Sequence, residues 1–128
     1  MKDLHSHISP VVSLIPAVIA ATASGAAIDL QGFNSAEFIV NTGAIAAAGD
    51  YTVKVQHAST TTSGDFTDCA AADLLGSLPA SLAADTVYRV GYKGGKRYVR
   101  HVITKNGGTS IIAGIVCLKG HPTNAPVA

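Results

Sequence analysis

The side chains best suited to chemistry gather between residues 88 and 100. Five of the nine basic residues fall there, with three tyrosines among them. The basic members are Arg89, Lys93, Lys96, Arg97 and Arg100, and the aromatic members are Tyr88, Tyr92 and Tyr98. Such a group on a β-ribbon can bind a nucleic acid backbone, dock on an acidic protein patch, or guard a sheet edge against stray pairing. A formal net charge of +1 supplies no field that would gather nucleic acid, so no nucleic acid partner is expected.

Groups for hydrolytic catalysis are poorly represented. Serine, histidine and aspartate all occur, but no Gly-x-Ser-x-Gly elbow does. The only glutamate is Glu37, so a pair of catalytic carboxylates would have to come from aspartates, and most of these stand at turn positions. Aspartate at a turn usually bonds backbone amides. We therefore expect no enzyme activity and no cofactor.

The histidines do not form a metal-binding pattern. His5 and His7 would share one face of an extended strand, but no further ligand completes a site of three or four. By alternation His57 and His101 fall on the inward faces of their strands. A polar N-terminal arm for the first pair, and core or edge positions for the second pair, are the expected structural roles. No metal is expected.

Composition points to a surface that is partly covered. Only 13% of the 128 residues are charged, against about 25% in typical proteins, while 48% are hydrophobic. A chain with so few charges has either a surface covered by a partner or a monomer surface made of Ser, Thr, Gly and Ala. Cys69 and Cys117 form one disulfide or remain two buried thiols. The apolar run 10–23 is too short and too broken for a membrane span.

Alternation of apolar and polar residues predicts strands rather than helices. The clearest strands are expected at 51–58, 86–92 and 96–104, and further strands at 25–32, 36–41 and 110–118. The stretch 9–23 should add one or two more, split at Pro16. Loops are expected at 43–50 and 59–65, and a helical turn at 70–75. Gly94-Gly95 should join two strands as a hairpin, and Asn106-Gly107-Gly108 should form the next turn.

About seven or eight short strands in one chain are typical of an all-β, single-domain β-sandwich, or of a jelly roll. We expect an N-terminal arm over 1–9, the sandwich over 10–119 and an extended tail over 120–128, because the prolines of the tail discourage pairing. The expected protein interface combines the basic segment with this tail. Its residues are Arg89, Lys93, Lys96, Arg97, Arg100, Tyr92, Tyr98, His121, Pro122 and Pro126.

Several segments from residue 26 onward form a recognisable set. They are AAIDLQGF at 26–33, VKV at 53–55, DFTD at 65–68, ADLLG at 72–76, VGY at 90–92, KRYVR at 96–100 and LKGHPTNAPV at 118–127. Together they resemble a family of small structural proteins encoded among the head and neck genes of tailed phages, prophages and related particles. The resemblance implies a virion structural role and brings no catalytic residues.

Within that resemblance, a capsid decoration or cement protein on the outer surface of a phage head fits the composition. It would be made in the host bacterial cytoplasm and located in the virion. The expected partners are the major capsid protein and copies of itself, with a trimer as the favoured homo-oligomer and no membrane partner. Two alternatives are a neck or tail component and a carbohydrate-binding module. The latter would use the 60–65 loop and the tyrosines, but the absence of Trp counts against it.

Overall fold

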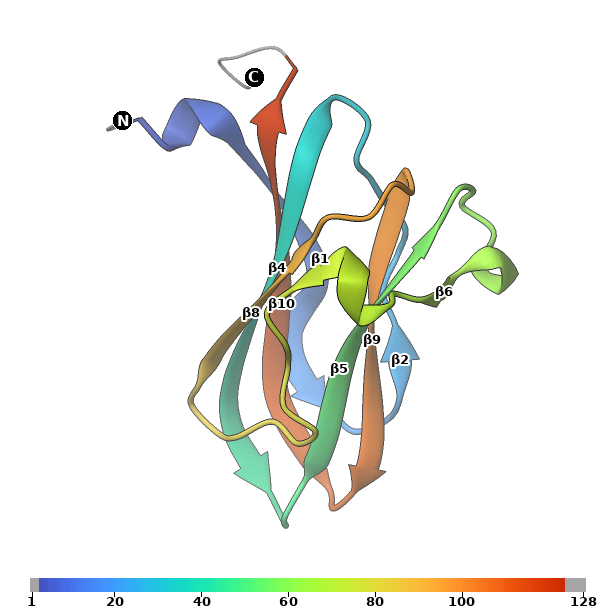
Figure 1. The fold of residues 1–128 in the computed structure, drawn as a ribbon. Helices are drawn as coiled ribbons and strands as arrows, with labels where there is room; N and C mark the ends of the chain where they lie inside the picture. The colour runs from blue at the N-terminus through green and yellow to red at the C-terminus, as the bar shows by residue number, and fades with distance from the viewer. Residues whose placement is uncertain (1–2, 124–128) are drawn as a thin grey trace.

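The computed structural model describes residues 3–123 and is built almost wholly of strands (Figure 1). The strands are β1 (Ile8–Ile19), β2 (Ala23–Ser24), β3 (Ile28–Asp29), β4 (Phe33–Ala46), β5 (Asp50–Ala58), β6 (Thr67–Asp68), β7 (Leu74–Leu75), β8 (Val87–Tyr92), β9 (Tyr98–Gly107) and β10 (Ser110–Pro122). Single turns of 3-10 helix are η1 (His5–His7), η2 (Ser63–Asp65) and η3 (Ala71–Asp73). The predicted all-β fold is confirmed.

Two antiparallel sheets lie face to face. The first sheet has the order β1-β10-β4-β8-β7, and the second has the order β2-β9-β5-β6, with β3 also paired to β9. The pairs are nested along the chain, since β1 pairs with β10, β2 and β3 with β9, β4 with β8, and β5 with β6. Nested antiparallel pairs divided between two sheets are the connectivity of a jelly roll.

The core lies between the two sheets, where alternate residues of each strand point inward. On β4 these are Phe38 and Val40, both 0% exposed, and on β9 they include Val99 and Ile103, also 0% exposed. Tyr51 of β5 is equally buried, and its hydroxyl donates a hydrogen bond of 3.2 Å to the Thr109 carbonyl. The predicted inward faces of the strands at 51–58 and 96–104 are therefore correct.

Strand β1 is continuous through Pro16, where a split was expected. The chain keeps pairing with β10 because two irregularities absorb the mismatch, one between Val12 and Leu14 and one between Leu14 and Ala17. In the second, Ile15 and Pro16 together stand opposite Gly114, as in a β-bulge. A Cβ on Gly114 would lie 2.8 Å from Cγ of Pro16, so glycine is required beneath the proline ring.

The expected hairpin at Gly94-Gly95 is wrong. Strand β8 lies in the first sheet and β9 in the second, so residues 93–97 cross from one sheet to the other. Neither Gly94 nor Gly95 has the positive φ that a two-residue hairpin turn needs. Gly94 is needed for another reason, since a Cβ there would lie 2.5 Å from the Tyr92 hydroxyl, which accepts a hydrogen bond from the Lys96 N–H.

The expected loop at 43–50 is shorter than predicted, because β4 continues to Ala46 before a tight turn. Ala47 and Ala48 have φ values of 48° and 58°, and the Gly49 N–H donates to the Ala46 carbonyl at 3.2 Å. Two consecutive left-handed residues are the signature of a type I′ turn, which favours Asn-Gly. Alanine is strained in this region of φ because its Cβ approaches the backbone.

We predict that Ala48→Gly stabilises the protein by about 1 kcal/mol, since relief of the left-handed strain exceeds the entropy gained by the unfolded chain. Ala44→Gly is the matched control. Ala44 is exposed in β4 and does not have a positive φ, so this change should destabilise by about 0.5–1 kcal/mol. Urea unfolding measures both, and equal effects of the two substitutions would contradict the strained turn.

The C-terminal boundary of the sandwich lies beyond residue 119, because β10 runs on to Pro122. Gly120 pairs with Ser35 and Pro122 with Phe33, both in β4. Proline is tolerated there because the β1 pairing with β10 begins at Ile8 opposite Gly120, so β1 forms no ladder hydrogen bonds with Pro122. His121 and Pro122, expected in a tail, are thus strand residues, and residues 124–128, with Pro126, lie outside the described range.

Candidate protein-interaction surfaces

The outward side of the first sheet is apolar over β1, β10 and their neighbours. We call this surface the outer apolar face. It comprises Val12, Pro16, Val18, Ile39, Gly43, Val87, Ile112, Gly114 and Val116. Its large side chains are well exposed, with Val12 at 59%, Val18 at 64% and Ile112 at 43%. No described segment of the chain covers it.

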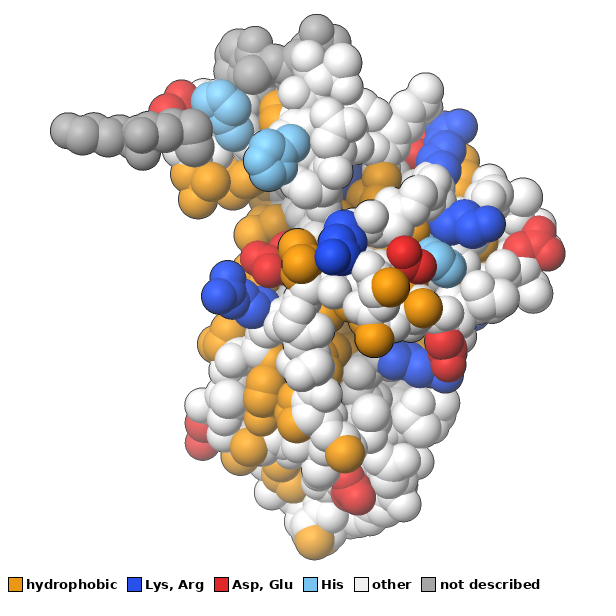
Figure 2. Space-filling model, viewed as in Figure 1, with side chains coloured by type: hydrophobic (Ala, Val, Ile, Leu, Met, Phe, Trp, Pro, Cys, Tyr) orange, Lys and Arg blue, Asp and Glu red, His pale blue; other side chains and the backbone are white. Residues whose placement is uncertain are grey.

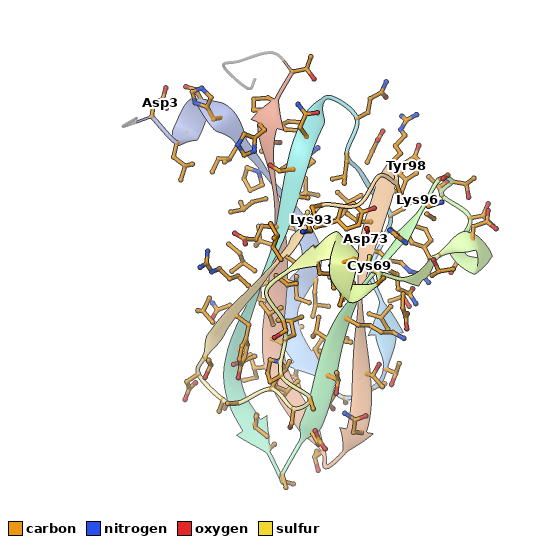
Figure 3. All side chains as sticks on the ribbon, in the orientation of Figure 1. Asp3, Cys69, Asp73, Lys93, Lys96 and Tyr98 are labelled. Carbon is orange, nitrogen blue, oxygen red and sulfur yellow. The ribbon has the colours of Figure 1, made fainter. Side chains whose placement is uncertain are left out.

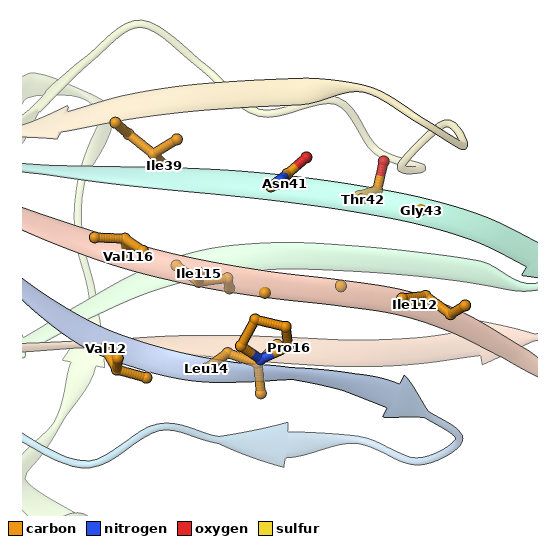
Figure 4. Close-up of a pocket in the computed structure, with 12 residues that line it drawn as sticks. Val12, Leu14, Pro16, Ile39, Asn41, Thr42, Gly43, Ile112, Ile115 and Val116 are labelled. Carbon is orange, nitrogen blue, oxygen red and sulfur yellow. The ribbon is translucent and has the colours of Figure 1, made fainter.

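Strand register arranges the outer apolar face as two ridges beside a hollow. Val12, Val116 and Ile39 stand opposite one another on β1, β10 and β4, and form one ridge. Val18 and Ile112 form the other. Between them, where β10 has Gly114, lies a groove of about 480 Å³ (Figure 4). The Pro16 ring packs over Gly114 in the groove, where the glycine has no side chain to occupy that space.

The outward side of the second sheet has the opposite character. Asp68 of β6 accepts a hydrogen bond of 2.8 Å from the Gln56 amide and forms an ion pair of 3.1 Å with Lys54. These contacts hold the pKa of Asp68 below its usual value, the Gln56 hydrogen bond being the larger cause. Arg100 donates to the Gln56 amide oxygen at 2.9 Å and covers the Phe66 ring at 4.4 Å. The outward side of the second sheet is therefore a solvated polar surface, in contrast to the outer apolar face of the first sheet.

The expected basic interface is divided among several places in the fold. Arg97 makes two hydrogen bonds of 2.8 Å to the Asp29 carboxylate and lowers the pKa of Asp29 to about 2. Arg100 belongs to the polar side of the second sheet, while Arg89 is exposed on the first sheet opposite Ile39. Lys93 and Lys96 are both exposed in the crossing segment, where the Lys93 N–H donates a hydrogen bond of 2.8 Å to the Asp73 carbonyl (Figure 3).

Two expected interface tyrosines are less accessible than their sequence positions indicated. Tyr92 is 3% exposed and points into the core, where its hydroxyl lies 2.9 Å from His57 Nδ1 and its ring packs at 90° to the imidazole. This corrects its placement on the surface. Tyr98 is half-buried beneath the Arg97 guanidinium, 5.1 Å from the ring centroid. His121 is exposed and bonds the Ser35 hydroxyl at 2.7 Å, and Pro122 is half-buried.

Charge is therefore unevenly distributed over the molecule. In Figure 2 the lysine and arginine side chains lie over the upper and middle parts of the visible face. We call the end with the crossing segment, where Lys93 and Lys96 are exposed, the charged end. The opposite end contains the turns at Ala47-Ala48 and Gly107-Gly108, where Asp50 and Lys105 are the neighbouring charged residues. Of the two outward sides of the sandwich, one is polar and one is apolar.

His101 and Cys117 are buried, and Cys69 is half-buried. His101 is 1% exposed, and its Nδ1 shares a hydrogen bond of 2.6 Å with Ser13 Oγ on the β1 irregularity. Its Nε2 is buried without a partner among the described residues. Cys69 and Cys117 are both free thiols, and burial raises the pKa of each to about 12. Of the two expected arrangements the structure has the two free thiols, although only Cys117 is fully buried, and neither thiol has the low pKa of a reactive cysteine.

Within residues 3–123, no group of three or more His, Cys, Asp or Glu side chains lies close enough to hold a metal ion. His5 is exposed in η1, and His7 Nδ1 lies 2.9 Å from the Asp3 carbonyl. The same part of the chain contains no helix that is both long and apolar enough to span a membrane.

Comparison with known proteins finds a likeness among solved structures. No protein-family model matches the sequence, and no curated protein matches it. Among solved structures, the fold is similar to part of a chain in the structure of infectious bursal disease virus, Gx strain, with a TM-score of 0.44 and 13% identity. The match covers 93% of this chain and 33% of the viral chain, so this chain spans about a third of that protein.

Sequence reasoning missed the outer apolar face, although a signal for it was present. Residues 111–118 read IIAGIVCL and are apolar without interruption, whereas a strand with one solvated side alternates. An uninterrupted apolar run is typical of a strand covered on both sides. In this fold the inner side is covered by the second sheet, and the outer side remains open.

Proposed function

We propose that this chain is a virion structural protein, and more specifically a capsid decoration protein that binds the outer surface of a phage head and stabilises the junctions between capsomers. The observation that carries the proposal is the pair of exposed lysines, Lys93 and Lys96, which form no ion pair with another described residue and can contact an acidic surface. The jelly roll supports it as a fold used by capsid domains, though it serves lectins and cupins as well.

The charged end is the surface that we propose meets the capsid. Lys93 and Lys96 are exposed there, and neither forms an ion pair with another described residue. Unpaired lysines on one end can dock on an acidic patch of the shell without first breaking internal bonds. Repeated weak contacts of this kind gain strength from the many symmetric copies on a particle.

We predict that the double variant Lys93→Glu and Lys96→Glu loses at least about tenfold in affinity for particles, because two attractive charges become repulsive. Lys105→Glu is the control, since Lys105 lies near the other end of β9, away from the crossing segment. The assay is co-sedimentation of the purified chain with particles from cells that encode it, at low and high salt. Equal binding by the double variant and the wild type would overturn the proposed docking end.

The number of copies per particle tests the function itself. A decoration protein should be present at a stoichiometry close to that of the major capsid protein, as measured by quantitative mass spectrometry of purified particles. A few copies per particle would indicate a neck or tail component. Absence from the particles would overturn the virion proposal altogether.

The structure weakens the carbohydrate-binding alternative. Tyr51 and Tyr92 are 0% and 3% exposed, so neither ring can serve as a platform for a sugar. Tyr88 and Tyr98 are half-buried, and the Tyr88 hydroxyl accepts a hydrogen bond from the Ala83 N–H at 2.9 Å. A sugar site usually needs an exposed flat ring, and none of these four residues provides a fully exposed one.

A further inference from the structure

We propose that the outer apolar face is the interface of a symmetric dimer, in which the face packs against the same face of a second copy of this chain. The inference concerns the isolated protein and does not rest on the proposed virion function. A symmetric dimer also differs from the trimer expected from the sequence. A surface that packs against the same surface of another copy joins two copies about a twofold axis and leaves none for a third.

Charge restricts what can cover the outer apolar face. Over the two ridges and the groove, the exposed polar side chain is Asn41, which is uncharged. The charged side chains of the same sheet surface lie beside the ridge that contains Ile39, Glu37 two residues away on β4 and Arg89 opposite Ile39 on β8. A partner that brought a charged group onto the groove would bury it without an opposite charge, which costs several kcal/mol. The covering surface must therefore be uncharged.

The chain itself supplies such a surface. Eight large hydrophobic side chains are exposed among the described residues, and five of them lie on the outer apolar face. These five are Val12, Val18, Val87, Ile112 and Val116, and the others are Leu4, Ile15 and Leu75. No other part of the described surface concentrates apolar side chains in this way. The outer apolar face is thus complementary in charge and polarity to its own copy.

The shape of the face favours the same pairing. The ridge that contains Val116 and the ridge that contains Ile112 rise on either side of the groove at Gly114. When two such faces meet across a twofold axis lying between the sheets, a ridge of each copy can enter the groove of the other. Sheets packed in this way lie about 10 Å apart with interdigitated side chains. Each copy then fills the hollow that the other leaves.

The free edge of the first sheet argues against the other way of joining two copies. Strand β1 is an edge strand, and it contains Pro10 and Pro16, which have no N–H to donate to a further strand. Its two irregularities also bend the strand away from regular pairing. Addition of a second copy along β1 is therefore disfavoured, and pairing through the outer apolar face does not require it.

Sedimentation velocity of the purified full chain over a range of concentrations tests the pairing. We expect a dimer for the wild type, and at least about 100-fold weaker association for Ile112→Lys, because each dimer would bury two unpaired ammonium groups. Leu4→Lys is the matched control, since Leu4 is 61% exposed and outside the face, and it should leave the dimer intact. Circular dichroism establishes that each variant is folded.

A mixing experiment separates a self-complementary face from a general loss of association. Ile112→Glu alone should be monomeric like Ile112→Lys, but an equimolar mixture of the two should recover dimers through opposite charges. Wild-type chain that stays monomeric at its highest soluble concentration would overturn the inference, as would dimers that both Ile112 variants leave unchanged. Neither result would affect particle binding through Lys93 and Lys96, so the two proposals fail separately.

Discussion

Lowering the pH from 6.5 to 4 is expected to cost the fold about 3 kcal/mol of stability through one residue, His101. Its side chain is 1% exposed between the sheets, and burial, with a smaller effect of Arg100, lowers its pKa from 6.5 to about 4. A shift of one pKa unit corresponds to about 1.4 kcal/mol. The neutral imidazole fits the core, and the imidazolium does not.

The sign follows from the two pKa values. Between pH 6.5 and 4 the unfolded chain binds a proton at His101 that the folded chain does not, so acid favours unfolding over this interval. The stabilising contribution is complete above pH 6.5, falls as the pH decreases, and changes no further below pH 4. The pKa values of Asp29 and Asp68 are lowered, so loss of their contributions falls mainly below this interval.

Urea unfolding at several pH values measures the effect, and His101→Gln should remove most of it. Glutamine does not titrate and can still hydrogen-bond the Ser13 hydroxyl, so the variant should show a nearly flat stability between pH 6.5 and 4. His57→Gln is the control and should retain the dependence of the wild type. Equal stability of the wild type at pH 4.5 and pH 7 would contradict the prediction, because it would show that the folded chain does not hold His101 in the neutral form.

Local alternation was sufficient to predict the strands whose two sides differ. Tyr51, Val53 and Val55 alternate with polar residues, and β5 spans nearly the predicted range with those three side chains in the core. The same pattern located β8 within one residue of its predicted start. In each strand one side packs against the opposite sheet and one side does not. Alternation of apolar and polar residues with a period of two indicates this arrangement.

Pairing between distant segments could not be read from local signals. Gly94-Gly95 has the composition of a hairpin turn, but β8 and β9 are separated because β4 and β5 occupy the neighbouring positions in the two sheets. The basic side chains on either side of this crossing are close together in the sequence, but the fold separates them, so the single basic interface predicted for them does not form. Arg97 and Arg100 bond to Asp29 and Gln56, partners 68 and 44 residues away. Contacts at such separations depend on topology, which no local pattern specifies.

The largest effect of a single substitution is expected at Phe38, where Phe38→Ala should destabilise the protein by about 4 kcal/mol. The ring is 0% exposed and stands between Val90 of β8 and Cys117 of β10, so its removal leaves a cavity that strands on both sides hold open. Denaturant unfolding at low protein concentration gives the difference in free energy.

Ile39→Ala is the matched control, because the two residues are adjacent in β4 and point to opposite sides of the first sheet. Ile39 is half-buried on the outer apolar face, so its truncation should cost about 1 kcal/mol or less in the monomer. The same change removes part of a ridge and should weaken the proposed dimer. Comparable losses of monomer stability at the two positions would show that the outer side of β4 is packed within a single chain. The outer apolar face would then not be open in the monomer.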